Sequence, residues 1–149
     1  MGIDYRLTLA GDIPLEQVAV LVAPEGSCTS TDAGHPRLLT VDCTTERGFG
    51  VSVFAGSNGY FDAEDDDGTP WEWEPDRYVN VIFDMANDQP DTATADMVAA
   101  VARVLADRPE DAALVLDNNW LLLTRTAGML RTHRPTWWDN YGLADIFTR

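Results

Sequence analysis

The sequence predicts an α+β fold, in which two or three helices pack on one face of a mainly antiparallel sheet of about six strands. Short segments that alternate apolar and polar residues recur along the 149-residue chain, and several are separated only by turn residues. Few segments have the spacing of an amphipathic helix. Strands joined by tight turns pair antiparallel, whereas parallel strands need long crossovers. At this length we expect a single domain over residues 1–149.

The N-terminal half predicts one strand, one short helix and a hairpin. Residues 4–10 alternate apolar and polar side chains, which is typical of a strand with one solvated face. Asp12 is a candidate N-cap for a short helix that Pro24 and Gly26 end. Residues 27–36 are rich in Ser, Thr, Gly and Pro and predict a loop. The next two predicted strands form a hairpin and cover residues 38–45 and 49–55.

The C-terminal half predicts a strand, a longer helix and then further strands. Residues 78–85 alternate apolar and polar side chains, and a helix capped by Asp91 or Thr92 is predicted to run to about Asp107. The buried stripe of this helix is expected to consist of Met97, Val98, Val101, Val104 and Leu105. The remaining strands are predicted at residues 112–116, 120–124 and 129–133.

Two connecting segments have clear local signals. Residues 117–119 predict a tight turn, because Asn tolerates the positive φ that such turns need. Pro135 begins a last segment that is predicted to be a short helix or an aromatic clasp. We expect Trp137, Trp138 or both to hold this segment on the sheet, since each ring can bury ~200 Å².

Residues 56–76 form an acidic segment that interrupts the alternating pattern. It contains eight acidic residues, two tryptophans and no basic residue. Exposed tryptophan is unusual on an ordinary surface and is typical of binding hot spots. In an extended segment Trp71 and Trp73 would point to the same side. The sequence therefore predicts a partner-binding surface made of Asp65, Asp66, Asp67, Trp71, Glu72, Trp73 and Glu74.

Part of this segment resembles the loop of a calcium-binding EF-hand. Asp65, Asp67, Gly68 and Glu74 stand at its third, fifth, sixth and twelfth positions, as in that loop. The first position is Ala63, which offers no ligand, and neither flank predicts a helix. We therefore expect no metal site, and only weak calcium binding by the carboxylates stays open as an alternative.

No complete catalytic motif is present in the sequence. Residues 55–59 follow a strand and resemble a nucleophile elbow around Ser57, with His133 as a conceivable base. No helix is predicted directly after Ser57, and no parallel sheet is predicted to bring the two residues together. Glycine-rich phosphate-binding motifs and paired metal-ligand spacings are also absent from the sequence. We expect no catalytic residue and no cofactor.

The charge balance limits the partners that the protein can bind. Twenty-five acidic and ten basic residues give a formal net charge of −15. Nucleic acid and anionic membranes both attract Lys and Arg, so neither is an expected partner. The N-terminus does not read as a signal peptide and no window is apolar enough for a membrane span, so a cytoplasmic location is expected.

Two N-terminal segments, residues 3–10 (IDYRLTLA) and 14–18 (PLEQV), resemble the start of the Sit-type immunity proteins, which are the partners of swarming-inhibition polymorphic toxins. The later order of helix, strand pair and aromatic segment is similar over residues 92–107, 112–125 and 135–138. This resemblance implies a small cytoplasmic α+β protein that has no enzymatic activity and that binds and neutralises a cognate toxin domain.

The residues alone are compatible with three classes of function. An acidic surface with aromatic anchors suits a basic toxin, because complementary charge accelerates association and blocking an active site needs no catalysis. A small acidic hydrolase of unknown substrate and a homo-oligomeric interaction domain are the alternatives. The sequence leaves the identity of the toxin and the oligomeric state open.

Overall fold

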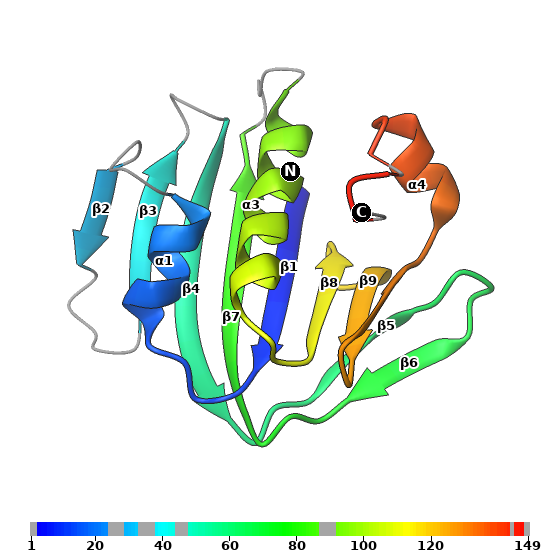
Figure 1. The fold of residues 1–149 in the computed structure, drawn as a ribbon, viewed down its shortest axis with the longest axis horizontal. Helices are drawn as coiled ribbons and strands as arrows, with labels where there is room; N and C mark the ends of the chain where they lie inside the picture. The colour runs from blue at the N-terminus through cyan, green and yellow to red at the C-terminus, as the bar shows by residue number, and fades with distance from the viewer. Residues whose placement is uncertain are drawn as a thin grey trace.

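Ten strands form one sheet in the part of the chain that the structure describes (Figure 1). The computed structural model describes residues 3–23, 29–32, 38–43, 48–86, 92–143 and 145–147, with only the backbone described in 29–32 and 38–43. In spatial order the strands are β2 (Thr29–Asp32), β3 (Leu38–Cys43), β4 (Phe49–Ser57), β7 (Arg77–Met85), β1 (Ile3–Ala10), β8 (Ala112–Leu116), β9 (Trp120–Thr126), β5 (Phe61–Glu64) and β6 (Pro70–Trp73), while β10 (Met129–Thr132) pairs with β9. All of these pairings are antiparallel except one parallel bridge between Glu64 and Trp120.

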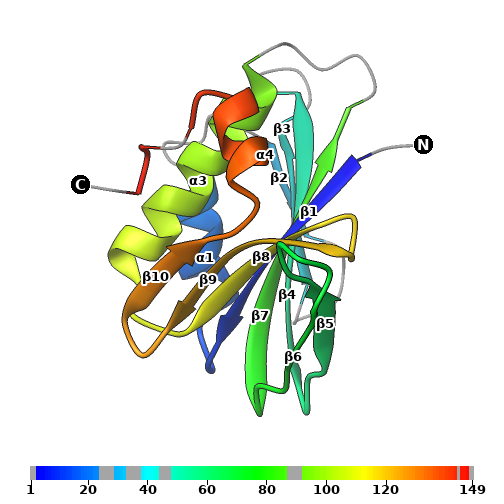
Figure 2. The same cartoon turned by 90° about the vertical axis from the view of Figure 1, so that its right-hand side faces the viewer.

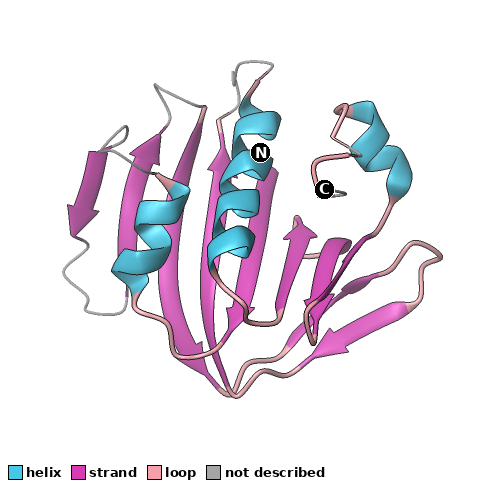
Figure 3. Ribbon diagram, in the orientation of Figure 1, coloured by secondary structure: helices cyan, strands magenta, loops and turns pink. Residues whose placement is uncertain are grey.

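The helices of the described residues lie on one face of this sheet. They are α1 (Leu15–Val22), α3 (Ala93–Asp107) and α4 (Pro135–Asn140). Figure 2 shows them together on one side of the sheet, and Figure 3 distinguishes them from the strands by colour. The predicted α+β class, the mainly antiparallel sheet and the helices on one face are confirmed.

The main core lies between the helices and the sheet. Alternate residues of β1, β7 and β8 point to this side because side chains of a strand alternate faces. Leu7, Val81 and Leu114 are fully buried there, in the same cluster as the stripe of α3. All five residues predicted for that stripe are buried, which confirms the prediction from helical spacing.

A second, smaller core lies on the opposite face of β8 and β9. It consists of Ala63, Ala113, Val115 and Leu121, and two tryptophans of β6 pack against it. Ala113 and Val115 alternate with residues of the main core, so β8 is buried on both faces. This second core exists because the β5–β6 hairpin covers the face that carries no helix (Figure 2).

Three predictions about local structure are wrong. The predicted loop at 27–36 contains β2, and the acidic segment contains β5 and β6, so the sheet has more than six strands. Each of these polar strands obtains its backbone hydrogen bonds from a neighbouring strand, which local periodicity does not reveal. Asp12 does not cap α1, because the N-cap position is Pro14. The carboxylate of Asp12 instead pairs with Arg77 at 3.1 Å.

The last segment is held on the sheet by a buried tryptophan. Trp138 in α4 is 1% exposed, and its indole N–H donates to the carbonyl oxygens of Leu122 and His133. Trp137 is partly buried and contacts Trp138 edge to face, with ring centroids 4.8 Å apart. The prediction that these rings hold the C-terminal segment on the sheet is therefore confirmed.

Candidate functional site

The predicted partner-binding residues lie on one β-hairpin, which we call the acidic hairpin (residues 61–74). Its two strands, β5 and β6, pair antiparallel from Phe61–Trp73 to Glu64–Pro70. The turn between them is closed by hydrogen bonds from the N–H of Asp65 to the carbonyl of Thr69 and from the N–H of Gly68 to the carbonyl of Asp65. Gly68 has φ of +82°, a conformation that glycine adopts without steric cost.

The two tryptophans of β6 point to the same side, as predicted. Their ring centroids are 6.0 Å apart, and both rings are partly buried against the small core of Ala113, Val115 and Leu121. Glu72 lies between them on the exposed side of the strand, and Glu74 is also exposed. The hairpin therefore presents carboxylates to solvent, while each indole ring packs partly on the sheet and is partly exposed to solvent.

The turn of the hairpin is attached to the segment between β10 and α4. The Nδ1 atom of His133 lies 2.7 Å from Oδ1 of Asp65 and 3.6 Å from Oδ1 of Asp66. The backbone N–H of Arg134 donates to Oδ1 of Asp66 at 2.8 Å, and its guanidinium donates to the carbonyls of Glu64 and Asp65. We call these four residues, Asp65, Asp66, His133 and Arg134, the clasp.

The clasp has part of the connectivity of a hydrolase triad. His133 is 3% exposed, and its Nε2 atom lies 3.1 Å from the hydroxyl of Thr124. With its proton on Nδ1, the ring donates to Asp65 and accepts from Thr124, so both nitrogens are satisfied. Thr124 lies within β9, and neither it nor His133 lines the surface hollows beside Ser57, Trp120 or Glu64. A hydrolytic centre also needs donors for an oxyanion, so the arrangement is better explained as a structural link.

The sequence as a whole matches one protein family. A sequence model of the family described as SitI3-like matches residues 3–142. The chain belongs to the SitI3-like family. No curated protein and no solved structure gave a match.

The family assignment confirms the resemblance to Sit-type immunity proteins. The family name indicates an immunity protein, and a protein of that kind has a toxin as its partner in general. Among the described helices of this SitI3-like protein, none is long and apolar enough to cross a membrane.

The acidic segment does not form the helix–loop–helix frame of an EF-hand. Strands flank it on both sides, and two of its carboxylates bond to nearby backbone N–H groups. Oδ1 of Asp65 accepts from the N–H of Asp66, and Oδ1 of Asp67 accepts from the N–H of Thr69. Asp65, Asp66 and His133 place three ligand atoms within 4.8 Å of one another, and these atoms hydrogen-bond within the clasp.

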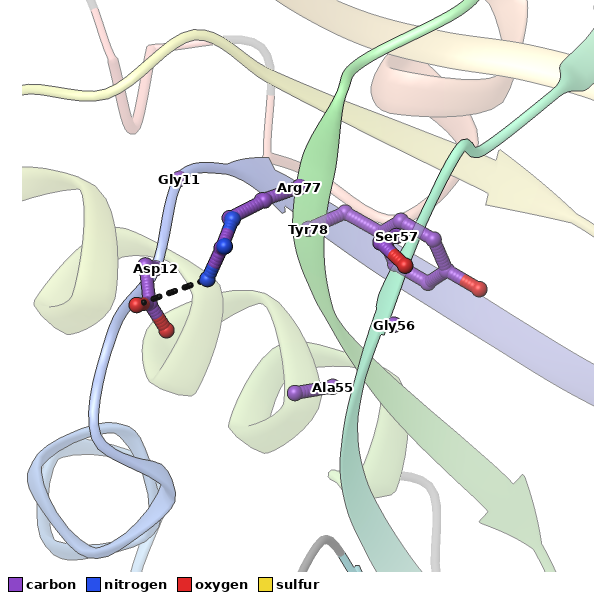
Figure 4. Close-up of a pocket in the computed structure, with 7 residues that line it drawn as sticks. All are labelled: Gly11, Asp12, Ala55, Gly56, Ser57, Arg77 and Tyr78. Carbon is purple, nitrogen blue, oxygen red and sulfur yellow. Dashed lines mark hydrogen bonds and ion pairs between the residues drawn. The ribbon is translucent and has the colours of Figure 1, made fainter.

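The nucleophile-elbow alternative is wrong as well. Ser57 ends β4 and is followed by a turn at Asn58, with φ of +54°, and then by β5. It lines a hollow of about 210 Å³ together with Tyr78 and the ion pair of Asp12 and Arg77 (Figure 4). The hydrogen-bond partners of His133 are Asp65 and Thr124, so Ser57 and His133 do not form a catalytic pair.

The clasp includes two residues that the sequence did not place in the site, His133 and Arg134. His133 lies 68 residues beyond Asp65, and Arg134 lies 68 residues beyond Asp66. No periodicity or motif spacing relates such distant positions. Only the pairing of β5 with β9 brings the turn of the hairpin to this segment.

Acid should weaken the clasp, because Asp65 then loses its charge. The N–H of Asp66 and the His133 ring hold the pKa of Asp65 below its ordinary value of 3.8, although partial burial acts in the opposite direction. A carboxyl whose pKa is lower in the folded chain stabilises the fold above its ordinary pKa. That stability is lost as the pH falls through the lower, folded pKa.

We therefore expect Asp65→Asn to lower the free energy of unfolding by roughly 1–2 kcal/mol at neutral pH, the range for a charge-assisted hydrogen bond. The difference from the wild type should shrink as the pH falls below 3.8, because the wild-type carboxyl also loses its charge. Urea unfolding at neutral pH and at about pH 2.5 measures both values. Glu16→Gln, at an exposed helix position, is the control. An equal difference at both pH values would contradict the role of the charge.

Proposed function

We propose that this SitI3-like protein is an immunity protein that neutralises a cognate toxin domain in the cytoplasm by covering its functional surface. The acidic hairpin is the contact surface, and Asp67, Trp71, Glu72, Trp73 and Glu74 are the residues that meet the toxin. Binding alone is sufficient for this function, so no catalytic step by the immunity protein is required.

The observation that supports this proposal is the chemistry of the hairpin. It presents Asp67, Glu72 and Glu74 to solvent beside two partly exposed indole rings. Interfaces are enriched in tryptophan, and rim charges steer an oppositely charged partner during association. With a net charge of −15, the protein suits a toxin whose functional surface is basic.

The structure divides the acidic residues into two groups. Asp65 and Asp66 bond to His133 and Arg134, so changing them would disturb the attachment of the hairpin as well as its charge. Asp67, Glu72 and Glu74 make no bond to His133 or Arg134 among the described contacts and are better sites for testing the toxin contact, although Glu72 is hydrogen-bonded to Tyr60. Of these, Glu72 and Glu74 are the simplest, because Asp67 also bonds to the turn.

The test of the function is protection of a growing culture. The toxin domain encoded by the neighbouring gene is expressed with and without this protein, because toxin and immunity genes must be inherited together. We expect the toxin alone to arrest growth and coexpression to restore it. Continued arrest in the presence of soluble, folded protein, with no complex on size-exclusion chromatography, would refute the proposal.

The exposed carboxylates should act mainly on the association rate. We expect the double change Glu72→Gln and Glu74→Gln to slow association with the toxin by roughly 3- to 10-fold at low salt, because rim charges act by steering. The effect should become smaller at about 0.15 M salt, where the Debye length is about 8 Å. Stopped-flow measurements at two salt concentrations provide both values.

A matched pair of carboxylates on the helical face is the control for this experiment. Glu16→Gln and Asp107→Asn remove the same charge from exposed positions on α1 and α3. Their association rate should stay near that of the wild type. Equal slowing by both pairs would show that only the net charge matters and that the hairpin is not the contact surface.

The tryptophans should act mainly on the dissociation rate. We expect Trp73→Ala to accelerate dissociation by roughly 30-fold, which corresponds to the ~2 kcal/mol of a buried hot-spot residue. Because the ring also packs on the sheet, the variant should lose some stability, and binding must be measured per folded molecule. Surface plasmon resonance, with the folded fraction taken from circular dichroism, makes this measurement. Unchanged dissociation in a destabilised variant would assign the ring to the protein's own core alone.

A further inference from the structure

Two neighbouring hollows lie at the turn between β8 and β9, beside the acidic hairpin. The first, of about 180 Å³, is lined by Asp62, Glu64 and Glu72 of the hairpin and by Asn118 and Asn119 of the turn. The second, of about 300 Å³, is lined by Leu116, Asp117, Asn119 and Trp120. Because Asn119 lines both, the hollows form one continuous surface from the hairpin to the far side of the turn.

The lining of these hollows suits cationic side chains. The first hollow contains three carboxylates and the second contains one, and among the described residues no arginine lines either hollow. Trp120 adds an aromatic ring that is 45% exposed, although the guanidinium of Arg134 already lies over it. A carboxylate beside an exposed aromatic ring attracts a guanidinium or ammonium group through charge and through cation–π attraction. The side-chain amide of Asn119 provides a further acceptor for N–H groups, whereas Oδ1 of Asn118 already accepts from Arg6.

The turn that separates the hollows is held in place by bonds to two strands. Asp117 and Asn118 have φ of +51° and +60°, which confirms the tight turn predicted from the sequence. The N–H and Oδ1 of Asp117 bond to the backbone carbonyl and N–H of Asp4 in β1. On the other side, the N–H of Glu64 donates to the carbonyl of Asn119 at 2.6 Å. A surface that is already ordered loses little conformational entropy when a partner binds.

Two arginines of the chain lie beside this surface, and Arg6 is close enough to Asp62 for the two charges to attract each other. Arg6 donates to Oδ1 of Asn118, and Arg134 donates to the carbonyls of Glu64 and Asp65 while its guanidinium covers the Trp120 ring at 4.6 Å. Asp4 adds a carboxylate next to Asp117 and has Asp84 as a second acidic neighbour. Partial burial and the neighbouring Asp84 raise the pKa of Asp4, as expected where carboxylates crowd without a cation. The carboxylates therefore outnumber the arginines.

We propose that two arginine or lysine side chains of a basic segment of the toxin bind in these hollows, one among Asp62, Glu64 and Glu72 and the other between Asp117 and Trp120. This inference rests on the proposed function and extends the contact surface from the hairpin to the β8–β9 turn. The complementary charge of the hollows and their position beside the hairpin select a cationic protein segment as the occupant.

The first experiment tests the hollows without the toxin. Arginine amide is titrated into ¹⁵N-labelled full-length protein, and norvaline amide, which lacks the guanidinium group, is the matched control probe. We expect arginine amide to shift the Trp120 indole and the side-chain amides of Asn118 and Asn119, and we expect norvaline amide not to do so. The shifts should become smaller in Asp117→Asn, whose side-chain oxygen can still accept from the Asp4 N–H. Equal shifts with both probes, or no shifts at these groups, would overturn the inference.

The second experiment uses the toxin domain. We expect Trp120→Ala and Asp117→Asn each to weaken binding by about 10-fold, the size of an interface contact of moderate strength. Trp120→Leu and circular dichroism check that any loss is not caused by unfolding of the β9 region. Binding by these variants that equals the wild type, while Trp73→Ala still accelerates dissociation, would overturn the inference and leave the proposed function intact. Failure of the wild type to bind the toxin would instead refute the proposed function.

Discussion

Trp138→Ala should lower the free energy of unfolding by about 3–5 kcal/mol, the range for removal of a fully buried large aromatic side chain. The ring is 1% exposed and belongs to the main core, where its edge contacts Trp137 and Phe147. Its removal leaves a cavity and also leaves the carbonyls of Leu122 and His133 without this donor. In a domain of this size the melting temperature should fall by roughly 10 °C or more.

Two further variants separate the causes of this loss. Trp138→Phe keeps most of the ring but removes the indole N–H, so its smaller loss reports the hydrogen bonds. Tyr141→Ala removes an aromatic ring that is 46% exposed, one turn further along the chain, and should change stability little. Differential scanning calorimetry compares the three proteins. A melting temperature within about 2 °C of the wild type for Trp138→Ala would show that α4 is not an essential part of the core.

Arg125→Ala should lower the free energy of unfolding by about 3 kcal/mol or more, because its guanidinium satisfies several buried carbonyls. Arg125 is 8% exposed and donates to the carbonyls of Leu105, Arg108 and Glu110, at the end of α3 and just beyond it. Helix C-termini leave carbonyls without intrahelical partners, and a cation there is favoured by the helix dipole. The last turn of α3 contains no basic residue of its own, and Arg108 follows it at the C-cap.

The controls for Arg125 distinguish its charge from its apolar stem. Arg125→Met keeps a long side chain, so a loss equal to that of Ala would assign the effect to the hydrogen bonds. Arg125→Lys keeps the charge but cannot present the planar set of donors, and we expect an intermediate loss. Arg131→Ala removes an exposed arginine from β10 as a surface control. Equilibrium unfolding in urea measures these differences, and equal stability of Arg125→Ala and Arg131→Ala would contradict the assigned role.

Both variants also test how the surface is supported. Arg125 ties the end of α3 to β9, and Trp138 ties α4 to β9 and to His133 of the clasp. β9 in turn pairs with β5 of the acidic hairpin. A variant that loses stability at these positions but still binds the toxin per folded molecule would show that the contact surface forms independently of α4.

Most of the fold could be predicted from the sequence, because its central elements have strong local periodicity. Alternating apolar residues located β1 and β7, a continuous apolar run located β8, and helical spacing located α3 with its buried stripe. The tight turn at Asp117 and Asn118 followed from residues that tolerate positive φ. In each of these cases the signal lies within a few neighbouring residues.

The hairpin and its attachment could be predicted only in part. Trp71, Trp73 and the acidic residues were identified by composition, and their shared side followed from the alternation of a strand. Their burial against Ala113, Val115 and Leu121 was not predictable, since it depends on which face of the sheet the hairpin covers. The segment lacks the apolar–polar alternation of a strand because it lies at the end of the sheet. Its strands form through backbone pairing with their neighbours, which the pattern of side chains does not reveal.

The sequence by itself determined the fold class, the main core and the acidic, tryptophan-containing character of the candidate surface. Periodicity, turn chemistry and charge are local properties, and each can be read without knowledge of the sheet order. Only the tertiary structure decided that Asp65 meets His133 and that the hairpin and the β8–β9 turn share a hollowed acidic surface. These contacts join residues far apart in the chain, and they depend on the position of β5 beside β9, which is set by the packing of the whole sheet.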